Sequence, residues 1–347
     1  MSSLLSILVV TNIYPTARRP TFGVFVEQQV NGLREIGVQV NVLFVNRAEQ
    51  GMRTYFQMSE PLRSAAAQAR PALVHLMYGG VMADRVTRWN PALPKIVTFH
   101  GSDLLGENYS GLWRRWVSRY GVCCSRRAAR RAQGVVLVSE SLRRSLPATL
   151  DPASIRVIPC GIDLNRFRAA DRLTCQRQLA WDPQSFHVMF ASNNGDPVKR
   201  PWLASAAVEV LERQGIRAEL HRMERVPYGD VPAWLNASDA LILTSAQEGS
   251  PTVVKEALAC GLPVVSVDVG DVAERIIGIP GCHLAEPTPE ALALKLNLVR
   301  QAGARVDAQA QVQALSTRNI AFRLEQFYRE TLSRQSVSPG GPSSVRP

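Results

Sequence analysis

Short apolar runs alternate with longer polar or amphipathic stretches along most of the chain. Five runs in the first half have the length and composition of buried strands, at residues 6–12, 38–45, 72–76, 95–99 and 134–139. The stretch 23–37 between the first two reads as a helix that Gly37 ends. Because strands that alternate with helices form parallel sheets covered on both faces, this pattern predicts an α/β domain.

The same alternation starts again in the second half. Its strand-like runs lie at 186–192, 216–221, 239–245 and 262–267, with a helical stretch at 201–215. We therefore predict two α/β domains, 1–165 and 166–317, joined by a hinge in VIPCGIDLNRF. A helix is expected at 318–332, and the tail 333–347 is rich in Ser, Pro and Gly and is expected to be disordered.

The stretch EGSPTVVKEALACGLPVVS, residues 248–266, carries helix start and stop signals. Ser250 can cap a helix, Pro251 suits the first helical position, and Gly261 suits the left-handed residue after the end. The following LPVVS reads as a buried strand. These signals predict a helix over 251–260.

Two glutamates lie in and just ahead of this helix. Glu256 follows Thr252 by four residues and lies on a stripe outside the apolar arc, so its side chain leans toward the helix start. Free backbone N–H groups at that start can hold a phosphate. Glu248 then reaches the far side of the same ligand. The alternative for Glu248 is that it simply complements the helix dipole.

The loop SNNGDPVKRPW supplies cations at the carboxyl edge of the second sheet, where ligands bind in open α/β folds. Lys199 stands out because the chain has 36 Arg and only four Lys. Lys199 and Arg200 are candidates for neutralising a diphosphate. A solvated pair of loop charges is the alternative.

Two segments of the first half end strands with residues suited to a ligand. FHGSD places His100 at the carboxyl end of a strand, followed by Gly101, which lets a ligand approach the backbone. A capping or core histidine is the alternative. In the loop NIYPTARRPTFG, Gly23 admits a phosphate or sugar, and Arg18 and Arg19 either bind an acceptor or form an exposed basic loop.

Charge is concentrated in the first half of the 347-residue chain. Residues 1–165 hold 20 Lys and Arg against 10 Asp and Glu, and residues 166–347 hold 20 against 19. The first half is therefore expected to bind an anion: a phosphorylated acceptor, an acidic membrane surface or nucleic acid.

The sequence contains no run of about 18 apolar residues, so no membrane-spanning helix is expected. The six cysteines lack metal-ligand spacing, which favours a reducing cytoplasm.

The segment 109–132 holds seven arginines and no acid. If it is helical, one stripe holds Arg115, Arg119, Arg126 and Arg130, and the adjacent stripe holds Trp113, Trp116 and Tyr120. That pattern is typical of a surface that lies on an anionic membrane. Gly121 is expected to break the segment into two helices. The alternative is an ordinary helix with its Trp side chains in the core.

Together these residues resemble glycosyltransferase family 4, whose members are retaining, nucleotide-sugar-dependent enzymes of the GT-B fold. The pattern E-G-S-P-x4-E-A-x-A-x-G-x-P-V-V (248–265) resembles the family signature. HGSD resembles the family's HGxD, and IPCGID with Phe167 resembles its interdomain linker. The opening TNIYPTARRPTFGVFVEQQ is similar to cell-surface polysaccharide members, including teichuronic acid transferases. The resemblance spans roughly residues 5 to 332.

The resemblance implies two Rossmann-like, doubly wound domains facing a cleft, with the last helix crossing back onto the first domain. It implies transfer of a sugar from a UDP- or GDP-linked donor to a lipid-linked or polysaccharide acceptor of envelope or exopolysaccharide synthesis. It assigns catalysis to Glu248 and His100, the donor ribose to Glu256, and the base to Arg225 and Val226. The remaining donor-binding residues are Lys199, Arg200, Gly23, Asn194, Ser250, Pro251, Thr252 and Val253.

Three departures from the family pattern leave the donor identity open. Asn193-Asn194-Gly195 replaces the usual Gly-Arg ahead of Lys199, which concerns the diphosphate. The early loop has one glycine, Gly23, where many members have two, and Gly270-Asp271 replaces a glycine pair. No metal or other cofactor is expected, and the localisation expected is cytoplasmic, at the inner face of the membrane. The alternatives are a nucleotide-sugar epimerase of the same fold, a basic nucleic-acid-binding protein, or a dinucleotide oxidoreductase. The last is disfavoured because no GxGxxG follows a strand.

Overall fold

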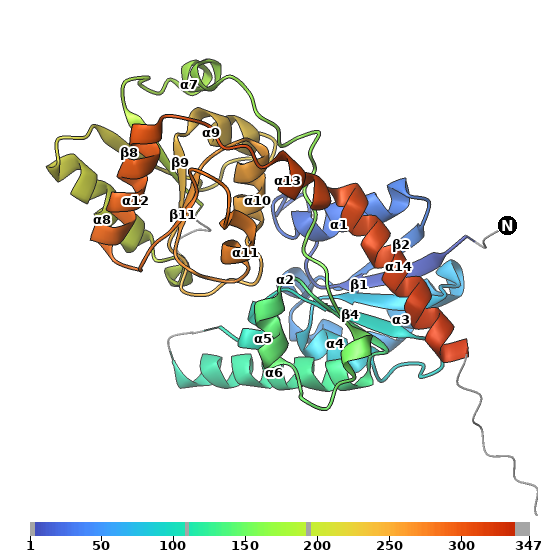
Figure 1. Ribbon diagram of the computed structural model, residues 1–347. Coiled ribbons are helices and arrows are strands. Elements are labelled where there is room, and N and C mark those ends of the chain that lie inside the picture. The colour runs from blue at the N-terminus through green and yellow to red at the C-terminus, as the bar shows by residue number, and fades with distance from the viewer. Residues whose placement is uncertain (1–3, 108–110, 192–195, 337–347) are drawn as a thin grey trace, which may run out of the picture.

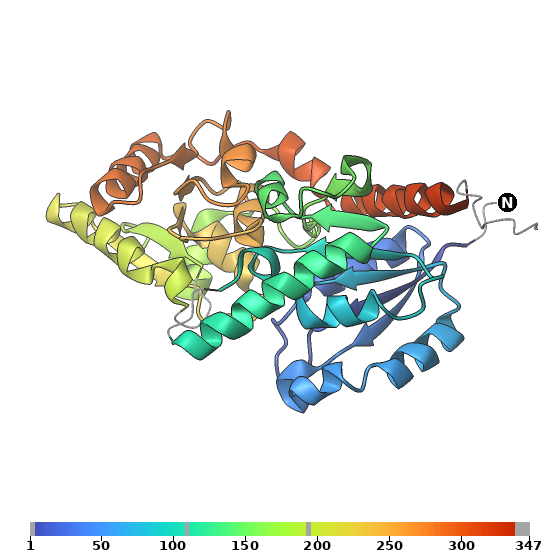
Figure 2. The ribbon, with the colours of Figure 1, turned by 90° about the horizontal axis from the view of Figure 1, so that it is seen from below.

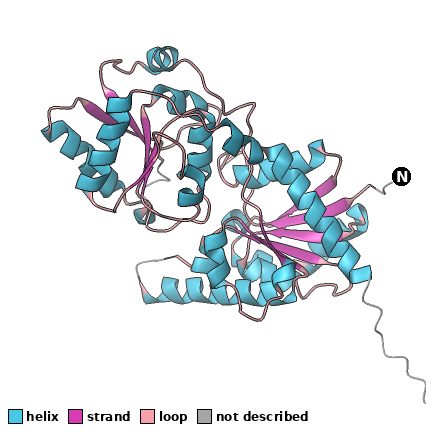
Figure 3. Ribbon diagram, in the orientation of Figure 1, coloured by secondary structure: helices cyan, strands magenta, loops and turns pink. Residues whose placement is uncertain are grey.

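The computed structural model describes residues 4–107, 111–191 and 196–336. Two α/β domains lie beside each other, each built on one parallel sheet flanked by helices (Figures 1 and 3). The predicted architecture of two α/β domains, each built on a parallel sheet, is confirmed. Among the described residues, no helix is long and apolar enough to cross a membrane.

The N-terminal sheet has six parallel strands in the order β2-β1-β3-β4-β5-β6. Its strands are β1 Ser6–Thr11, β2 Gln39–Phe44, β3 Leu73–Met77, β4 Lys95–Phe99, β5 Gly134–Leu137 and β6 Ile155–Val157. Every residue of β3, β4 and β5 is buried, as expected for central strands covered on both faces. The order reverses between β1 and β3, so the carboxyl ends of these strands open a crevice for a ligand.

The C-terminal sheet has five parallel strands in the order β11-β10-β9-β7-β8. Its strands are β7 Phe186–Phe190, β8 Ala218–Arg222, β9 Ala240–Leu243, β10 Val264–Ser266 and β11 His283–Leu284. Here the order reverses between β7 and β9, which makes a second crevice at their carboxyl ends. The sequence analysis missed β6 and β11, whose three and two residues are too short to form a run.

Helices cover both sheets. Those of the N-terminal domain are α1 Val24–Glu35, α2 Arg47–Gln50, α3 Ser59–Ala69, α4 Gly80–Val86, α5 Ser102–Leu105 and α6 Leu112–Arg131, with 3-10 turns at Met52–Tyr55, Glu140–Ser145 and Pro152–Ser154. Those that follow are α7 Arg172–Leu179, α8 Pro201–Arg213, α9 Val231–Ala237, α10 Thr252–Ala259, α11 Val272–Ile276, α12 Pro289–Ala302, α13 Gln309–Ala314 and α14 Thr317–Ser336, with a 3-10 turn at Pro197–Lys199.

The chain crosses between the domains twice, and the two crossings run side by side. The backbone N–H of Ile162 donates to the carbonyl of Leu315 (2.9 Å), and that of Thr317 donates to Ile162 (2.9 Å). Gly161 is required here because a Cβ would lie 2.8 Å from the Cα of Thr317. The predicted hinge is thus two hydrogen-bonded segments.

After the second crossing, α14 packs on the N-terminal domain beside α1 (Figure 1). Its Leu324, Phe327 and Tyr328 are buried with residues of the first sheet. The Tyr328 hydroxyl also lies 2.6 Å from Nδ1 of buried His75. The helix therefore crosses back as the resemblance implied. It extends to Ser336, four residues beyond its predicted end.

Candidate active site

A cavity of about 610 Å³ lies between the domains, at the carboxyl ends of both sheets. Both domains line it, which is typical of ligand sites in folds with two facing sheets. It brings together eleven residues predicted from the sequence: Gly23, His100, Lys199, Arg225, Val226, Glu248, Ser250, Pro251, Thr252, Val253 and Glu256.

Glycines let the loops from the two domains meet at this cavity. A Cβ on Gly249 would lie 2.0 Å from the carbonyl oxygen of His100, and one on Gly270 would lie 2.8 Å from the carbonyl oxygen of Gly249. Gly101 adopts a φ of 130°, a conformation open to glycine. The loop that carries Glu248 is therefore held between the His100 loop and the Gly270 loop, which fixes Glu248 and His100 relative to each other.

The Glu248 carboxylate forms an ion pair with Lys199, at 2.5 Å between Oε1 and Nζ. The two side chains are 13% and 18% exposed, so the pair is shielded but open to a ligand. Lys199 ends the 3-10 turn Pro197–Lys199, and its carbonyl accepts from the Thr244 hydroxyl at 2.7 Å. A ligand diphosphate would compete with Glu248 for this ammonium group.

Glu256 is buried within α10 and faces the cavity. Its Oε1 accepts a hydrogen bond from the Tyr228 hydroxyl (2.9 Å), which in turn accepts from Nε2 of Gln28 on α1 (2.9 Å). Burial raises the pKa of Glu256 to about 7, although the Tyr228 hydrogen bond lowers it. These two consecutive hydrogen bonds join the two domains across the cavity. The sequence analysis missed Gln28 and Tyr228, because only the fold brings them to Glu256.

His100 presents a neutral ring to the cavity. Burial, together with the charge of Lys255, lowers the pKa of His100 to about 3. Its Nδ1 lies 3.7 Å from the Cys160 sulfur, and the Phe25 ring packs at 4.8 Å between centroids. Its Nε2 is buried and has no hydrogen-bond partner among the described residues. An unsatisfied buried nitrogen that lines a cavity is positioned to bond to a ligand hydroxyl.

The backbone of the His100 loop is held by buried Asp103. This carboxylate accepts from the N–H groups of Gly79 (2.9 Å), His100 (3.0 Å) and Gly101 (2.9 Å). Burial raises the pKa of Asp103 to about 6 despite these bonds. The aspartate two residues after the glycine in HGSD was the available sequence signal for this positioning role.

Lys255 is a further residue that the sequence analysis missed. It is fully buried, and its Nζ donates to the Ser250 hydroxyl (2.9 Å) and to the Cys160 carbonyl (3.1 Å). The Ser250 hydroxyl donates to Asp271 at 2.7 Å. The expectation that Ser250 caps the helix is therefore wrong: Pro251 is the cap residue of α10, and no side chain caps it. The sequence signal that could have predicted this network is a lysine directly before Glu256 in an otherwise apolar helix.

Sequence comparisons identify both domains. The profile described as Glycosyltransferase Family 4 matches residues 17–166, and that described as Glycosyl transferases group 1 matches residues 178–300. The chain belongs to the family 4-like glycosyltransferases. This transferase assignment replaces the epimerase, nucleic-acid-binding and oxidoreductase alternatives.

The glycosyltransferase is 25% identical to the teichuronic acid biosynthesis glycosyltransferase TuaC of Bacillus subtilis over 332 residues, covering 78% of this chain and 82% of the relative. It is 27% identical to D-inositol 3-phosphate glycosyltransferase 2 of Catenulispora acidiphila over 160 residues, 36% of this chain and 37% of the relative.

Solved structures share the fold. Sucrose-phosphate synthase of Thermosynechococcus elongatus superimposes with a TM-score of 0.75 at 16% identity, covering 95% of this chain and 100% of the other. Anabaena Alr3699/HepE in complex with UDP gives 0.60 at 17% identity, covering 96% and 98%.

Arg200, predicted at the donor, and Arg18 and Arg19, predicted at the acceptor, are absent from the described lining of the cavity. Arg200 donates from Nε to the Thr244 carbonyl (2.5 Å) and from a terminal nitrogen to that of Ser245 (3.2 Å), so in this glycosyltransferase it anchors the loop after β9. Its assignment to the diphosphate stays a prediction. Arg18 and Arg19 are exposed on the loop before α1 and do not reach the cavity. Asn194 falls outside the described residues.

The basic segment forms one helix, α6, which projects from its own sheet toward the C-terminal domain (Figures 1 and 2). Gly121 does not break it, because a single glycine costs a 20-residue helix only about 1 kcal/mol. Trp113 and Trp116 are 79% and 68% exposed, so the alternative of core tryptophans is wrong. A groove of about 740 Å³ runs along the helix, lined by Arg115, Arg119, Arg126 and Arg130.

A hydrogen bond links the lining of this groove to the loop that carries Glu248. Its lining includes Gly106 and Glu107, and the Gly106 carbonyl accepts from Nε2 of Gln247 at 2.9 Å. Gln247 directly precedes Glu248. The arginine-lined groove is therefore attached to the loop of Glu248, although its described lining shares no residue with that of the cavity.

Proposed function

We propose that this glycosyltransferase moves a sugar from a nucleotide-diphosphate donor, with retention of anomeric configuration, to a hydroxyl of a lipid-linked acceptor at an anionic membrane. The observation that carries the proposal is the cavity that holds Glu248, Lys199 and Glu256 at the start of α10, opposite His100. A nucleotide-sugar donor is further supported by the fold neighbour Alr3699/HepE, which has been solved in complex with UDP-glucose.

The donor would lie along the start of α10. Its diphosphate would form an ion pair with the Lys199 ammonium and would accept hydrogen bonds from the backbone N–H groups of Thr252 and Val253. These residues line the cavity at the positive end of the helix. Its ribose hydroxyls would donate to Glu256, because a carboxylate accepts several hydrogen bonds. Its base would lie against Arg225 and Val226.

The reaction would break the bond between the anomeric carbon and the diphosphate oxygen. Lys199 and the helix start would stabilise the charge that develops on the leaving diphosphate. The acceptor oxygen would attack the same face, and the leaving phosphate would take its proton. The Glu248 carboxylate, released from Lys199, would lie beside the oxocarbenium-like carbon and stabilise it. Neutral His100 would accept one hydrogen bond from a sugar hydroxyl or donate one to it.

The acceptor side is supported by α6. Trp113 and Trp116 are amphipathic rings of the kind that insert at the headgroup level, and the adjacent arginine groove offers charge to a phosphate. A phosphate-bearing lipid bound there would lie on the membrane while its sugar end reaches the cavity beside Gln247. Such an arrangement corresponds to a peripheral enzyme on the inner face of the cytoplasmic membrane.

Donor binding tests the first half of this proposal. A panel of UDP- and GDP-linked sugars is titrated into the wild type, Glu256→Ala and the exposed control Glu212→Gln on α8. We expect one donor class to bind the wild type and the control and to lose at least tenfold in affinity for Glu256→Ala. Equal binding by all three proteins would contradict the placement of the ribose.

Vesicle sedimentation tests the second half. The wild type should bind vesicles that contain anionic phosphatidylglycerol more tightly than neutral phosphatidylcholine vesicles, and less tightly at high salt. Trp113→Ala with Trp116→Ala, and separately Arg115, Arg119 and Arg126 changed to Gln, should weaken that binding without lowering the melting temperature. Unchanged vesicle binding in both variants would refute the membrane part of the proposal and would leave the donor-binding part standing.

A further inference from the structure

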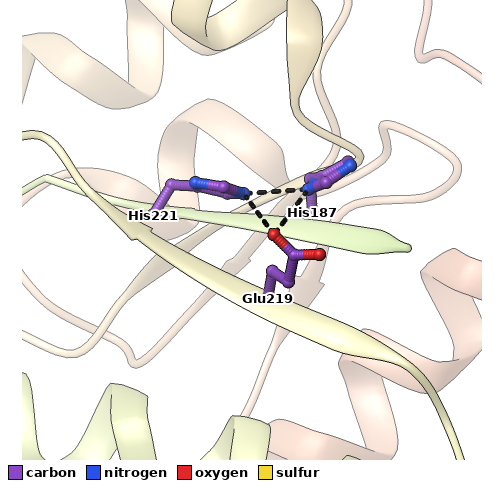
Figure 4. A group of neighbouring side chains, drawn as sticks. All are labelled: His187, Glu219 and His221. Atoms are coloured by element: carbon purple, nitrogen blue, oxygen red, sulfur yellow. Dashed lines mark hydrogen bonds and ion pairs between the residues drawn. The ribbon is translucent and has the colours of Figure 1, made fainter. Parts of the chain in front are cut away.

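Two histidines and a glutamate converge at one edge of the C-terminal sheet (Figure 4). His187 lies in β7, and Glu219 and His221 lie in the edge strand β8. The strand register pairs His187 with Glu219, and residues two apart in a strand share a face. All three side chains therefore point to the same side of the sheet, and Figure 4 shows their polar ends directed at one another.

The His187 ring is held in one tautomer. Its Nε2 lies 2.7 Å from the Asp182 carbonyl oxygen, which can only accept, so Nε2 carries the hydrogen. Its Nδ1 therefore presents a lone pair toward His221 and Glu219. A backbone carbonyl that takes the second ring N–H is the usual device that orients a metal-binding histidine.

The His221 ring is fixed as well. It stacks on Trp181 with the ring centroids 3.5 Å apart and the planes 10° from parallel. His187 is fully buried, whereas the Glu219 side chain is 44% exposed and leaves a path for an ion to enter. Two fixed rings and one partly exposed carboxylate make a site that needs little rearrangement to bind an ion.

The three ligand atoms lie close enough together for one metal ion to contact all of them. Nδ1 of His187 lies 2.8 Å from Nε2 of His221, and Oε2 of Glu219 lies 3.9 Å and 3.8 Å from these two nitrogens. The point equidistant from the three atoms is about 2.1 Å from each, which matches the Zn–N and Zn–O bond lengths of about 2.0–2.2 Å.

We propose that His187, Glu219 and His221 bind a zinc ion, with a water molecule as the fourth ligand. Two imidazoles and one carboxylate suit Zn²⁺, and they disfavour Mg²⁺ and Ca²⁺, which prefer oxygen ligands. An ion at this point would replace the hydrogen shared by the two imidazole nitrogens and would part them toward the wider ligand spacing of a tetrahedral site. None of the three residues belongs to the cavity lining described, so the site is separate from the transfer reaction.

The ion would join the edge strand to the rest of its sheet. Within the described sheet β8 is bonded to β7 alone, and its chain continues into Met223, Arg225, Val226 and Tyr228, which line the donor cavity. A link between β7 and β8 would therefore stabilise the C-terminal domain and hold the segment expected to contact the base. The second consequence rests on the proposed function, and the metal site itself does not.

Metal binding is tested on the full chain without a histidine tag. After dialysis against EDTA, Zn²⁺ is added, bound metal is counted, and thermal unfolding is recorded with no nucleotide present. We expect one ion per chain and a rise in the melting temperature of roughly 5 °C. Co²⁺ should give the visible absorption of a tetrahedral site. No bound ion, or no rise in melting temperature, would overturn the proposal.

Variants show whether these residues hold the ion. Glu219→Gln and His221→Gln should each lose the cobalt absorption and the zinc-dependent rise, whereas His283→Gln, on the opposite edge strand β11, should keep both. Each variant is compared with its own metal-free form, so a general loss of stability does not count as loss of the site. Zinc binding by Glu219→Gln as tight as that of the wild type would refute the ligand assignment. Because no donor is present, failure here leaves the proposed transfer untouched.

Discussion

The affinity for the donor should rise with pH because Glu256 must be ionised to accept the ribose hydroxyls. Burial raises the pKa of Glu256 to about 7, so roughly a tenth is ionised at pH 6 and roughly nine-tenths at pH 8. Since only the ionised fraction binds well, the apparent dissociation constant should fall about tenfold between these two values. His100 stays neutral throughout, because its pKa is about 3.

Replacing Tyr228 by Phe should move this pH dependence upward. The Tyr228 hydroxyl donates to Glu256 at 2.9 Å and lowers its pKa. A hydrogen bond to a charged group contributes about 1.5–3 kcal/mol, and one pKa unit corresponds to about 1.4 kcal/mol. In Tyr228→Phe, the midpoint of the pH dependence of donor affinity should therefore shift upward by at least about one pH unit.

The assay is calorimetric titration with a nucleotide sugar, whose diphosphate does not titrate in this range, at half-unit steps of pH. Asp103 titrates nearby because burial raises its pKa to about 6, and it acts on the backbone of the His100 loop. Glu256→Gln separates the two effects, since any dependence that it retains belongs to Asp103. An identical midpoint in the wild type and Tyr228→Phe would refute the reasoning.

Three further substitutions test the cavity and α6. Glu248→Gln should lower kcat/KM by about 10²–10³ while donor binding changes little, as measured by initial rates beside the control Glu212→Gln. Gly249→Ala should abolish transfer, because its Cβ would lie 2.0 Å from the His100 carbonyl oxygen; wild-type activity would contradict the contact between the loops. Gly121→Ala in α6 has open space for its Cβ and should raise the free energy of unfolding by about 0.5–1 kcal/mol with activity unchanged.

The long apolar runs allowed the sequence to predict most strands and both domains. Nine runs were predicted as strands and each overlaps one strand of the structure, because central parallel strands are buried on both faces and leave an uninterrupted signal. The sequence also predicted that the two glutamates of the EGSP stretch lie at a ligand site. This was possible because local helix signals placed Glu256 within α10, close to its start.

Contacts between segments far apart in the chain could not be predicted. Tyr228 and Gln28 are 200 residues apart and meet only when the domains face each other. Arg200 was predicted as a phosphate ligand because its loop ends at a helix, yet its left-handed backbone (φ 50°) accompanies a guanidinium that donates to carbonyls of the loop after β9. The His187 cluster needs the register of β7 against β8, which no local pattern specifies.

The Lys255 ammonium connects the hinge to the active site. Cys160 belongs to the first crossing between the domains and accepts from Lys255, which also holds Ser250 at the start of α10. The same charge helps to keep His100 neutral on the opposite domain. A buried ammonium needs all its partners, because an unpaired charge in the interior is strongly destabilising. A movement at the hinge that displaces the Cys160 carbonyl would therefore also disturb the helix start. If the proposed diphosphate binds there, such a movement would be energetically coupled to donor binding.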